Sequence, residues 1–394
     1  MHKHKYKICH LLYEEFPRDP RARRYVNALN ETGILSIVIC SKKKKDKYFE
    51  IWKGNLVYRI PVAKHRQSFF LTSLEYISFS FVSTFMLAYL GIRYRFKIIQ
   101  VHTLPDFLIF AAMLNKLLGA KLILDLHEVF PELFIARKPH LESSFWVKLL
   151  KFTESVSIKL ANLVLTIHDP AKEILLKRNK GLEKKLHVIM NGVDPSEITN
   201  KNRVYAGDFI ILYNGTVVKL LNLQIIIQAL KILKSKMSDE DFKKIKFIIY
   251  GDGPAVNELL ELSEKLNLKE KVIYNGFIPQ NKIFEEVLKA SVCILPPIKN
   301  IYSDLFYTTK LTEMIYLKIP VIATRLNTYK HYYSEDALFY FDSGNVEQLP
   351  DRIMEVFYNK ELVSSKTEKA FLEYQKVSWE IMKKKYLEII NGLK

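Results

Sequence analysis

The stretch FIILYNGTVVKLLNLQIIIQAL, residues 209–230, decides the fold. It begins with an apolar run that is short enough for a buried strand, passes a glycine turn at 214–216 and continues into an apolar pattern of helical length. A strand that is followed at once by a helix is the repeating unit of a parallel sheet covered by helices. The stretch therefore predicts an α/β fold.

Similar strand patterns recur on both sides of a polar stretch that ends near Asp208. The runs before it are YKICHLL, ILSIVIC, NLVYRI, KIIQVH, KLILDL and LVLTI, and those after it are FIILYN, IKFIIYG, KVIYNG, SVCILPP, PVIAT and LFYF. A chain of 394 residues is long enough for two domains. We predict two Rossmann-like domains, over 1–195 (joined by a C-terminal helix, 378–394) and over 205–377.

Composition limits the cellular compartment and the binding partners that we expect. Cys9, Cys40 and Cys293 lie far apart in apolar runs, without disulfide or metal-ligand spacing, so we expect a reduced compartment. The basic N-terminus has no long apolar segment or cleavage site, which favours a cytoplasmic protein over a secreted one. The net charge of +18 fits nucleic acid, anionic lipid, an anionic substrate or a lysine-rich proteome. No zinc finger, ribonucleoprotein signature or Arg-rich helix accompanies it, so we expect no nucleic-acid partner.

Phosphate-binding signals follow the strands of the second half. Gly215 and Thr216 form a turn directly after a strand, and Lys219 lies just before a helix. Backbone amides at such a turn attract an anion, and a lysine adds a charge. Gly251 and Phe277 follow the next two strands, where a flat ring can approach the chain. The alternative is a solvated lysine and ordinary turn residues.

The strongest local signal is YSDLFYTTKLTEMIYLKIPVIAT, residues 302–324. Glu313 lies in an apolar helix, where its carboxylate can accept two hydrogen bonds from ribose hydroxyls. Lys310 lies three residues earlier on the same helical face, and Thr308 and Thr309 offer backbone amides at the helix start. The alternative is a surface glutamate that the helix dipole favours.

In the first half, KLILDLHEVFPE, residues 121–132, ends a strand at Asp125, with His127 and Glu128 directly beyond it. A histidine next to two carboxylates at a strand end can contact a reacting sugar or transfer a proton. A structural histidine that is satisfied by hydrogen bonds is the alternative.

Taken in this order, the motifs resemble family-four glycosyltransferases of the GT-B fold, the glycosyl transferases group 1. The resemblance runs from YEEFPRDPRARRYVNAL (13–29) to SWEIMKKKYLEII (378–390). It implies retaining transfer of a sugar from a nucleotide diphosphate donor, with the nucleotide held mainly by the C-terminal half. The N-terminal half would hold the acceptor, a glycan or a lipid-linked glycan, and the last helix would pack on the first domain.

Residue by residue, the resemblance implies that Lys219 contacts the donor diphosphate, Glu313 the ribose, and His127, the expected catalytic residue, the transferred sugar. The full set of expected donor contacts is Gly215, Thr216, Lys219, Gly251, Phe277, Thr309, Lys310 and Glu313. The residues expected at the acceptor or in the cleft are Asp19, Arg21, Asp125 and Glu128.

The sequence departs from the family pattern at the donor site. The family often has a glutamate eight positions before Glu313, where this chain has Leu305. Lys310 or Asp304 could substitute for the missing sugar contact. The family's arginine before the diphosphate lysine is Val217 or Val218 here, so Lys310 could also supply the second positive charge.

The first loop departs as well. The glycine-rich loop of many members is replaced by an Asp-x-Arg sequence, in which Asp19 and Arg21 could pair with each other or touch ligand. Asp239–Asp241 formally matches the carboxylate pair of metal-dependent transferases, but it lies in a lysine-rich connector and is expected to be a solvated loop. We expect no metal and no cofactor, because lysines, amides and helix dipoles can meet the diphosphate charge.

Residues 69–90, FFLTSLEYISFSFVSTFMLAYL, are long enough to span a bilayer, but Glu75 and several hydroxyl residues interrupt them. On a helical wheel one face is apolar, with Phe70, Leu74, Ile77, Phe81, Phe85 and Ala88, and another carries Thr72, Ser73, Ser80, Ser83 and Thr84. An in-plane or core-packed helix fits better than a span. The basic flanks, which favour peripheral contact with an anionic inner membrane surface, are Lys64, Arg66, Arg93, Arg95 and Lys42–Lys45. An ordinary buried helix is the alternative.

Two other functions remain open. A nucleotide-sugar epimerase could use the same fold, although KLTEM and NGTVVK favour a transferase. An inactive subunit that binds glycan or a true transferase would fit Leu305 and the missing arginine. Donor turnover separates these possibilities.

Overall fold

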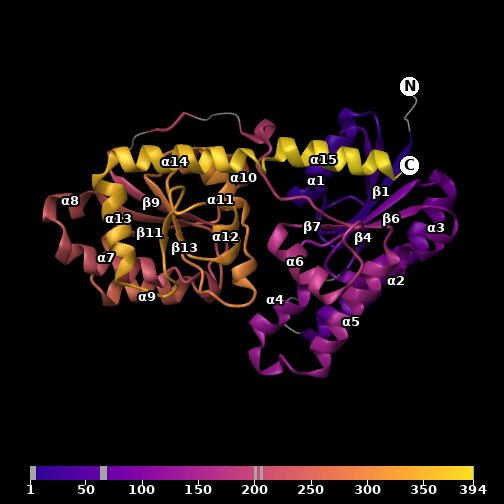
Figure 1. Cartoon of the computed structure of the whole chain (residues 1–394), viewed down its shortest axis with the longest axis horizontal. Coiled ribbons are helices and arrows are strands. Elements are labelled where there is room, and N and C mark those ends of the chain that lie inside the picture. Colours follow the sequence, from indigo (N-terminus) through magenta and orange to yellow (C-terminus); the bar gives the residue numbers. More distant parts are fainter. Residues whose placement is uncertain (1–5, 63–68, 199–201, 205–206, 394) are drawn as a thin grey trace. The chain divides into compact units, whose positions relative to one another are not determined.

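The structure, a computed structural model, describes residues 6–62, 69–198, 202–204 and 207–393. The chain divides into two units, one formed by Met1–Met190 with Glu380–Lys394 and the other by Asn191–Trp379. Each unit is a sheet with helices on both faces (Figure 1). The predicted α/β fold is therefore confirmed.

Unit 1 contains an eight-stranded sheet of order β3-β4-β2-β1-β5-β6-β7-β8, in which every pair is parallel except β3 with β4. Its strands are β1 (Lys7–Leu12), β2 (Leu35–Lys42), β3 (Phe49–Trp52), β4 (Asn55–Pro61), β5 (Ile98–His102), β6 (Lys121–Asp125), β7 (Leu163–Thr166) and β8 (Leu186–Val188). Its helices are α1 (Pro20–Glu31), α2 (Phe69–Tyr94), η1 (Asp106–Ala112), α3 (Met113–Leu117), α4 (Phe130–Arg137), η2 (Pro139–Leu141), α5 (Phe145–Leu160), α6 (Asp169–Arg178) and α15 (Trp379–Gly392).

Two helices at opposite ends of the sequence meet on one face of this sheet. Ala22 and Val26 of α1 pack onto the apolar side chains of β1, β2 and β4. The last helix, α15, belongs to unit 1 and lies beside α1 (Figure 1). The ring centres of Tyr386 and Tyr25 lie 4.2 Å apart with their planes tilted by 33°, and the Tyr386 hydroxyl donates to Gln100 Oε1 of β5 at 2.7 Å. The C-terminal segment thus completes the N-terminal domain.

Unit 2 contains a six-stranded parallel sheet of order β11-β10-β9-β12-β13-β14. Its strands are β9 (Phe209–Asn214), β10 (Ile245–Tyr250), β11 (Val272–Gly276), β12 (Val292–Leu295), β13 (Val321–Thr324) and β14 (Phe339–Phe341). Its helices are η3 (Pro195–Glu197), η4 (Lys219–Leu221), α7 (Gln224–Lys236), α8 (Asp239–Lys244), α9 (Val256–Lys265), η5 (Lys269–Lys271), α10 (Gln280–Val287), η6 (Ser303–Leu305), α11 (Thr309–Tyr316), α12 (Asn327–Tyr332), α13 (Gln348–Tyr358) and α14 (Lys360–Gln375).

Strand β9 packs into two hydrophobic cores, one on each face of the sheet. Ile211 and Tyr213 pack with α7, α9 and α13 on one face of the sheet. Ile210 and Leu212 pack with α10, α11, α12 and α14 on the other. Burial of each such side chain contributes about 1.5 to 3 kcal/mol, so the continuous apolar run stabilises a strand that is covered on both faces. Its polar groups follow at the carboxyl end, where the helices begin.

Candidate functional site

In unit 1, polar side chains converge where β1, β5 and β6 end. His102 and Asp125 are register partners on β5 and β6, and His127 follows two residues after Asp125. The Asp125 side chain is fully buried and accepts a hydrogen bond from Arg21 Nη2 at 2.7 Å. His102 Nδ1 lies 2.9 Å from Asp125 Oδ2, and His127 Nε2 lies 3.2 Å from the same oxygen. The structure thus brings together three of the predicted residues, Arg21, Asp125 and His127.

The Asp-x-Arg loop places Arg21 through a helix cap. Asp19 is the N-cap of α1 and accepts a hydrogen bond from the amide of Ala22 at 2.7 Å. Pro20 opens the helix, and Arg21 in its first turn reaches both Asp125 and the main-chain oxygen of Ile189, the latter at 2.7 Å. Asp19 therefore fixes the start of α1, and Arg21 neutralises the buried carboxylate of Asp125. Breaking such a buried pair costs about 3 to 5 kcal/mol.

The charges of this cluster follow from burial and from Arg21. Burial opposes the ionisation of Asp125, but the Arg21 guanidinium and the two neighbouring histidines hold its pKa well below the usual range. Burial lowers the pKa of His102, and burial and His102 lower the pKa of His10, whose Nδ1 lies 3.2 Å from His102 Nε2. Because a carboxylate can only accept, the Nδ1 of His102 carries its proton and its Nε2 accepts from His10.

His127 is the member of the cluster that solvent reaches, with 19% of its side chain exposed. Its amide donates to Thr103 Oγ1 at 3.2 Å, and its Nε2 contacts the carboxylate of Asp125. When Nε2 is the donor in that contact, Nδ1 is left as an acceptor for a ligand hydroxyl. Glu128 lies half-buried in the bend between β6 and α4.

The same three side chains could hold a metal ion. One ligand atom each of His102, Asp125 and His127 lies within 4.8 Å of the others. A divalent cation would, however, sit next to the Arg21 guanidinium that already compensates Asp125. The arrangement fits a hydrogen-bonded support for His127 better than a cation site.

In unit 2, two glycine turns pack against each other where β9 and β10 end. Gly215 and Gly251 have φ angles of 133° and 134°, a region that side-chain-bearing residues rarely adopt. A Cβ on Gly251 would lie 1.8 Å from the Gly215 oxygen, and one on Gly215 would lie 2.1 Å from Lys310 Nζ. These glycines are therefore required for the backbones and the lysine to come together.

Lys310 occupies the space above this turn. It lies in the first turn of α11, which Thr308 caps by accepting from the Leu311 amide, and its Nζ lies 5.0 Å from the centre of the Tyr213 ring. Burial lowers the pKa of Lys310. Among the residues that the structure describes, no carboxylate lies within ion-pair distance of it, although the charge of Glu313 on the same helix acts to raise its pKa. A partly buried lysine and a helix start thus meet at the end of β9, beside the Gly215 turn.

Other predicted donor contacts are at the surface of unit 2. Lys219 is 75% exposed and pairs with Glu258, itself 58% exposed, at 2.8 Å. Such an exposed pair contributes less than about 1 kcal/mol, so a phosphate can replace Glu258 at little cost. Phe277 is 80% exposed after β11, and Thr216 is also exposed.

The structure also places the residues at which the chain departs from the family pattern. Asp304 accepts from the Asn327 amide at 2.6 Å and so holds the start of α12. Val217 is 1% exposed in the core, and Leu305 is buried. Glu313 lies partly buried in the second turn of α11, on the helix that carries Lys310. Of the two substitutes considered for the missing carboxylate and arginine, Lys310 is the one next to the glycine turns.

The acidic run Asp239–Asp241 forms the first turn of α8. Asp241 accepts from Lys244 Nζ at 2.9 Å and from the Tyr358 hydroxyl at 3.0 Å. The prediction of a solvated loop was therefore wrong: the run starts a short helix that Ser238 caps, and Asp241 forms contacts at the surface.

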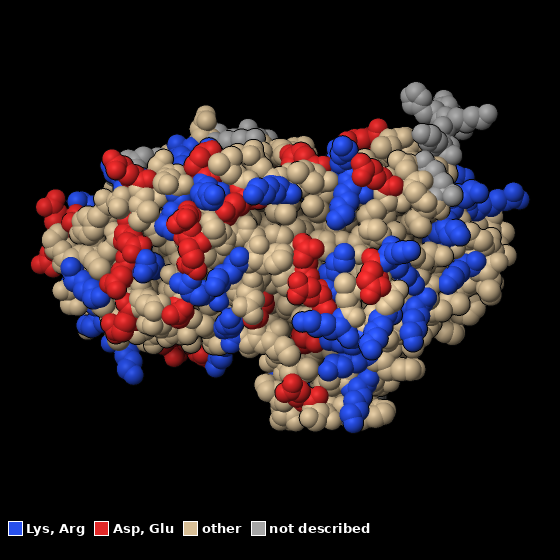
Figure 2. Space-filling view, viewed as in Figure 1, with Lys and Arg blue, Asp and Glu red and all other residues tan. Residues whose placement is uncertain are grey.

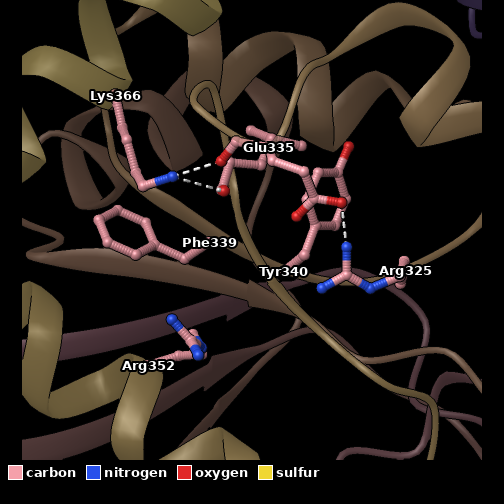
Figure 3. A pocket seen from close by; sticks show the side chains of 7 residues that line it. Arg325, Glu335, Phe339, Tyr340, Arg352 and Lys366 are labelled. Carbon is pink, nitrogen blue, oxygen red and sulfur yellow. Dashed lines mark hydrogen bonds and ion pairs between the residues drawn. The ribbon is translucent and has the colours of Figure 1, made fainter.

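Beside β14, a cavity of about 140 Å³ is lined by basic and aromatic side chains (Figure 3). Arg325 pairs with Glu335, and Lys366 donates to the main-chain oxygens of Glu335 and Leu338. None of the predicted donor residues lines this cavity. Its contacts connect α14 to the strand at the edge of the sheet.

Sequence reasoning missed His10 and His102, which contribute to the support of His127. Each lies within an apolar run, so its polar role was hidden until the parallel register brought β1, β5 and β6 together. A histidine ending the KIIQVH strand was the available signal.

Two models of known protein families match adjoining parts of the chain. The model of Glycosyltransferase Family 4 matches residues 21–197, and that of Glycosyl transferases group 1 matches residues 194–375. No curated protein sequence matches the chain.

Solved structures of similar fold cover nearly the whole chain. Sucrose-phosphate synthase from Thermosynechococcus elongatus is 13% identical, with a TM-score of 0.76 and 99% of each chain covered. WaaG, a glycosyltransferase involved in lipopolysaccharide biosynthesis, is 14% identical, with a TM-score of 0.71 and 98% of this chain and all of the other covered (100%). Anabaena HepE, solved in complex with UDP and glucose, is 14% identical, with a TM-score of 0.69 and 98% and 99% covered. With both halves matched by the family models, the chain belongs to the family-four glycosyltransferases of the GT-B fold.

Proposed function

We propose that this glycosyltransferase is a retaining enzyme that moves a hexosyl or N-acetylhexosaminyl group from a nucleotide diphosphate donor to a glycan or lipid-linked acceptor. The observation that carries the proposal is Lys310, a partly buried cation that is held over the Gly215 turn and makes no ion pair within the described residues. Desolvation disfavours the charged form of this lysine, and a bound diphosphate would offset that cost.

The donor would bind along the carboxyl ends of the unit 2 strands. Lys310 and Lys219 contact the diphosphate together with the amides at Gly215, Thr216 and the start of α11 near Thr309. Glu313 accepts hydrogen bonds from the ribose. The exposed ring of Phe277 and the side-chain-free turn at Gly251 suit a flat base. HepE from Anabaena, solved with UDP and glucose, supports a nucleotide on this fold.

In the transfer step the bond between the anomeric carbon and the diphosphate oxygen breaks, and the acceptor oxygen takes its place with the same configuration. Negative charge develops on the leaving diphosphate, where Lys310 stabilises it most strongly because its surroundings are desolvated. We assign His127 to the transferred sugar, with Asp125 and Arg21 holding its ring. These cations and amides meet the charge of the donor without a metal ion or cofactor.

We place the reaction at the cytoplasmic face of the inner membrane, with the enzyme peripheral to it. Support comes from α2, an apolar helix of unit 1, and from the net charge of +18, which suits an anionic surface. The acceptor held by unit 1 is then a membrane-linked glycan.

A panel of UDP and GDP sugars tests the proposal. Release of nucleoside diphosphate from one donor, and its loss in Lys310→Met, is the expected result. An epimerised donor without release of diphosphate would identify an epimerase, and binding without turnover of any donor, with or without glycan acceptors, would identify an inactive subunit.

A further inference from the structure

Helix α2 is turned with its apolar side outward. The apolar residues Leu74, Ile77, Phe81 and Phe85 are 47% to 64% exposed. Of the hydroxyl residues, Ser83 is fully buried, Ser78 is exposed, and Thr72, Ser73, Ser80 and Thr84 are partly buried. A surface helix of a soluble domain normally has the reverse arrangement, because burial of apolar side chains drives its packing.

The helix is nevertheless a part of unit 1. Phe79 and Leu87 are buried in the core, and the Tyr13 hydroxyl donates to Glu75 Oε2 at 2.8 Å. Within the described parts of the chain, Leu71–Tyr94 is the one helix long and apolar enough to cross a membrane, and 33% of its most apolar window is buried. A helix that packs on the protein along one side and exposes apolar side chains along the other suits a position in the plane of a membrane surface.

Neighbouring elements extend this surface. Helix α2 contacts η1 and α3, and α5 contacts η1. Leu108 of η1 and Ile158 of α5 pack into the same core as Phe79 of α2, so the outer sides of these elements face away from the same sheet. We call their exposed apolar residues the apolar face: Leu71, Leu74, Ile77, Phe81, Val82, Phe85, Tyr89, Ile92, Phe110, Leu114, Leu117, Leu118, Phe145, Trp146, Leu149 and Phe152.

The exposed charges on the helices that carry the apolar face have one sign, although Glu142, in the turn before α5, is also exposed. The acidic side chains of α2, η1 and α5, namely Glu75, Asp106 and Glu154, are all buried. The lysines and arginines remain at the surface, and Figure 2 shows them gathered over the part of unit 1 that contains α2 and α5. On these elements they are Arg93, Lys116, Lys148, Lys151 and Lys159. Lys64 and Arg66, which the sequence also suggested, lie outside the described residues.

We propose that the apolar face and its basic rim dock the enzyme on an anionic lipid bilayer, with α2 lying in the plane of the membrane surface. The inference rests on the proposed transfer to a membrane-linked acceptor and identifies the surface that would reach it. Apolar side chains enter such an interface to about 5 to 10 Å, while lysines and arginines contact anionic headgroups. A symmetric pair of chains would instead bring two basic rims together, which like-charge repulsion opposes.

Vesicle sedimentation tests the proposal. The full chain should bind vesicles of phosphatidylglycerol and phosphatidylcholine more tightly than phosphatidylcholine alone, and high salt should weaken binding. Phe81→Ser with Phe85→Ser, and separately Phe145→Ser with Phe152→Ser, should each reduce the partition coefficient about tenfold or more. The matched control, Tyr358→Ser with Leu372→Ser, removes exposed apolar side chains from unit 2 and should bind like the wild type.

Three results would overturn the docking surface: no vesicle binding by the wild type, unchanged binding by both double variants, or a wild-type dimer that these variants convert to monomers. Donor hydrolysis without vesicles separates this outcome from the proposed function. Turnover without vesicle binding would refute the surface alone, whereas vesicle binding without turnover of any donor would refute the proposed function alone.

Discussion

Replacing Lys310 by Met tests the donor site, because it removes the charge and keeps an apolar chain of similar length over Gly215. Loss of a charge-assisted hydrogen bond costs about 1.5 to 3 kcal/mol, so affinity for the nucleoside diphosphate should fall about tenfold to a hundredfold. The stability of the free protein should not fall with the affinity and should rise or stay unchanged. Burial lowers the pKa of Lys310, which means that folding disfavours its charged form at neutral pH.

The assay pairs titration calorimetry with UDP and GDP and a thermal unfolding curve of the free protein. The expected signature is weaker nucleotide binding by a variant that is at least as stable as the wild type. Lys231→Met, an exposed lysine of α7, is the matched control and should change neither quantity. Unchanged nucleotide affinity in Lys310→Met would refute the assignment. A loss of nucleotide affinity together with a loss of stability in the unfolding curve would show that the lysine is structural.

The other predictions concern single side chains in both units. His127→Ala should abolish transfer yet keep nucleotide affinity, because a residue used mainly in the transition state affects turnover, and full activity would make the histidine structural. Glu313→Gln should weaken nucleotide binding about tenfold or more without unfolding the protein, as measured by calorimetry. Burial and the nearby Glu154 raise the pKa of Asp106 to about 8, so its cost to folding grows as pH rises from about 4 to about 8. Asp106→Asn should therefore stabilise the protein by about 1 to 3 kcal/mol at pH 8 and by less near pH 4, and an equal effect at both values in chemical denaturation would contradict this.

The sequence predicted the glycine turns, all six strands of the unit 2 sheet and six of the eight strands of the unit 1 sheet, but not the short strands β3 and β8. A short apolar run such as FIILYN has no polar position for solvent, so it predicts a strand buried on both faces. The glycines at its end were recognisable, but the reason for them was not: the oxygen of Gly215 fills the place of a side chain on Gly251. That close approach depends on how two loops pack, which no local pattern encodes.

The sequence could not predict which of the two lysines contributes more to the donor site. Lys219 and Lys310 carry the same charge, yet Lys219 is 75% exposed beside Glu258 and Lys310 is partly buried beside Tyr213. Likewise, the helical wheel identified an apolar and a hydroxyl face of α2, but not which face meets the core. Long-range packing decides the burial of the lysines and the orientation of α2. In the same way, only the pairing of β5 with β6 brings His102 next to Asp125 and His127.

The most direct test of the account follows the anomeric proton of the sugar by NMR while the wild-type enzyme turns over a donor identified from the UDP and GDP panel. We predict release of nucleoside diphosphate together with a product whose anomeric configuration equals that of the donor, and neither signal with Lys310→Met. Release with inverted configuration would contradict the retaining mechanism, and undiminished release by Lys310→Met would contradict the donor site.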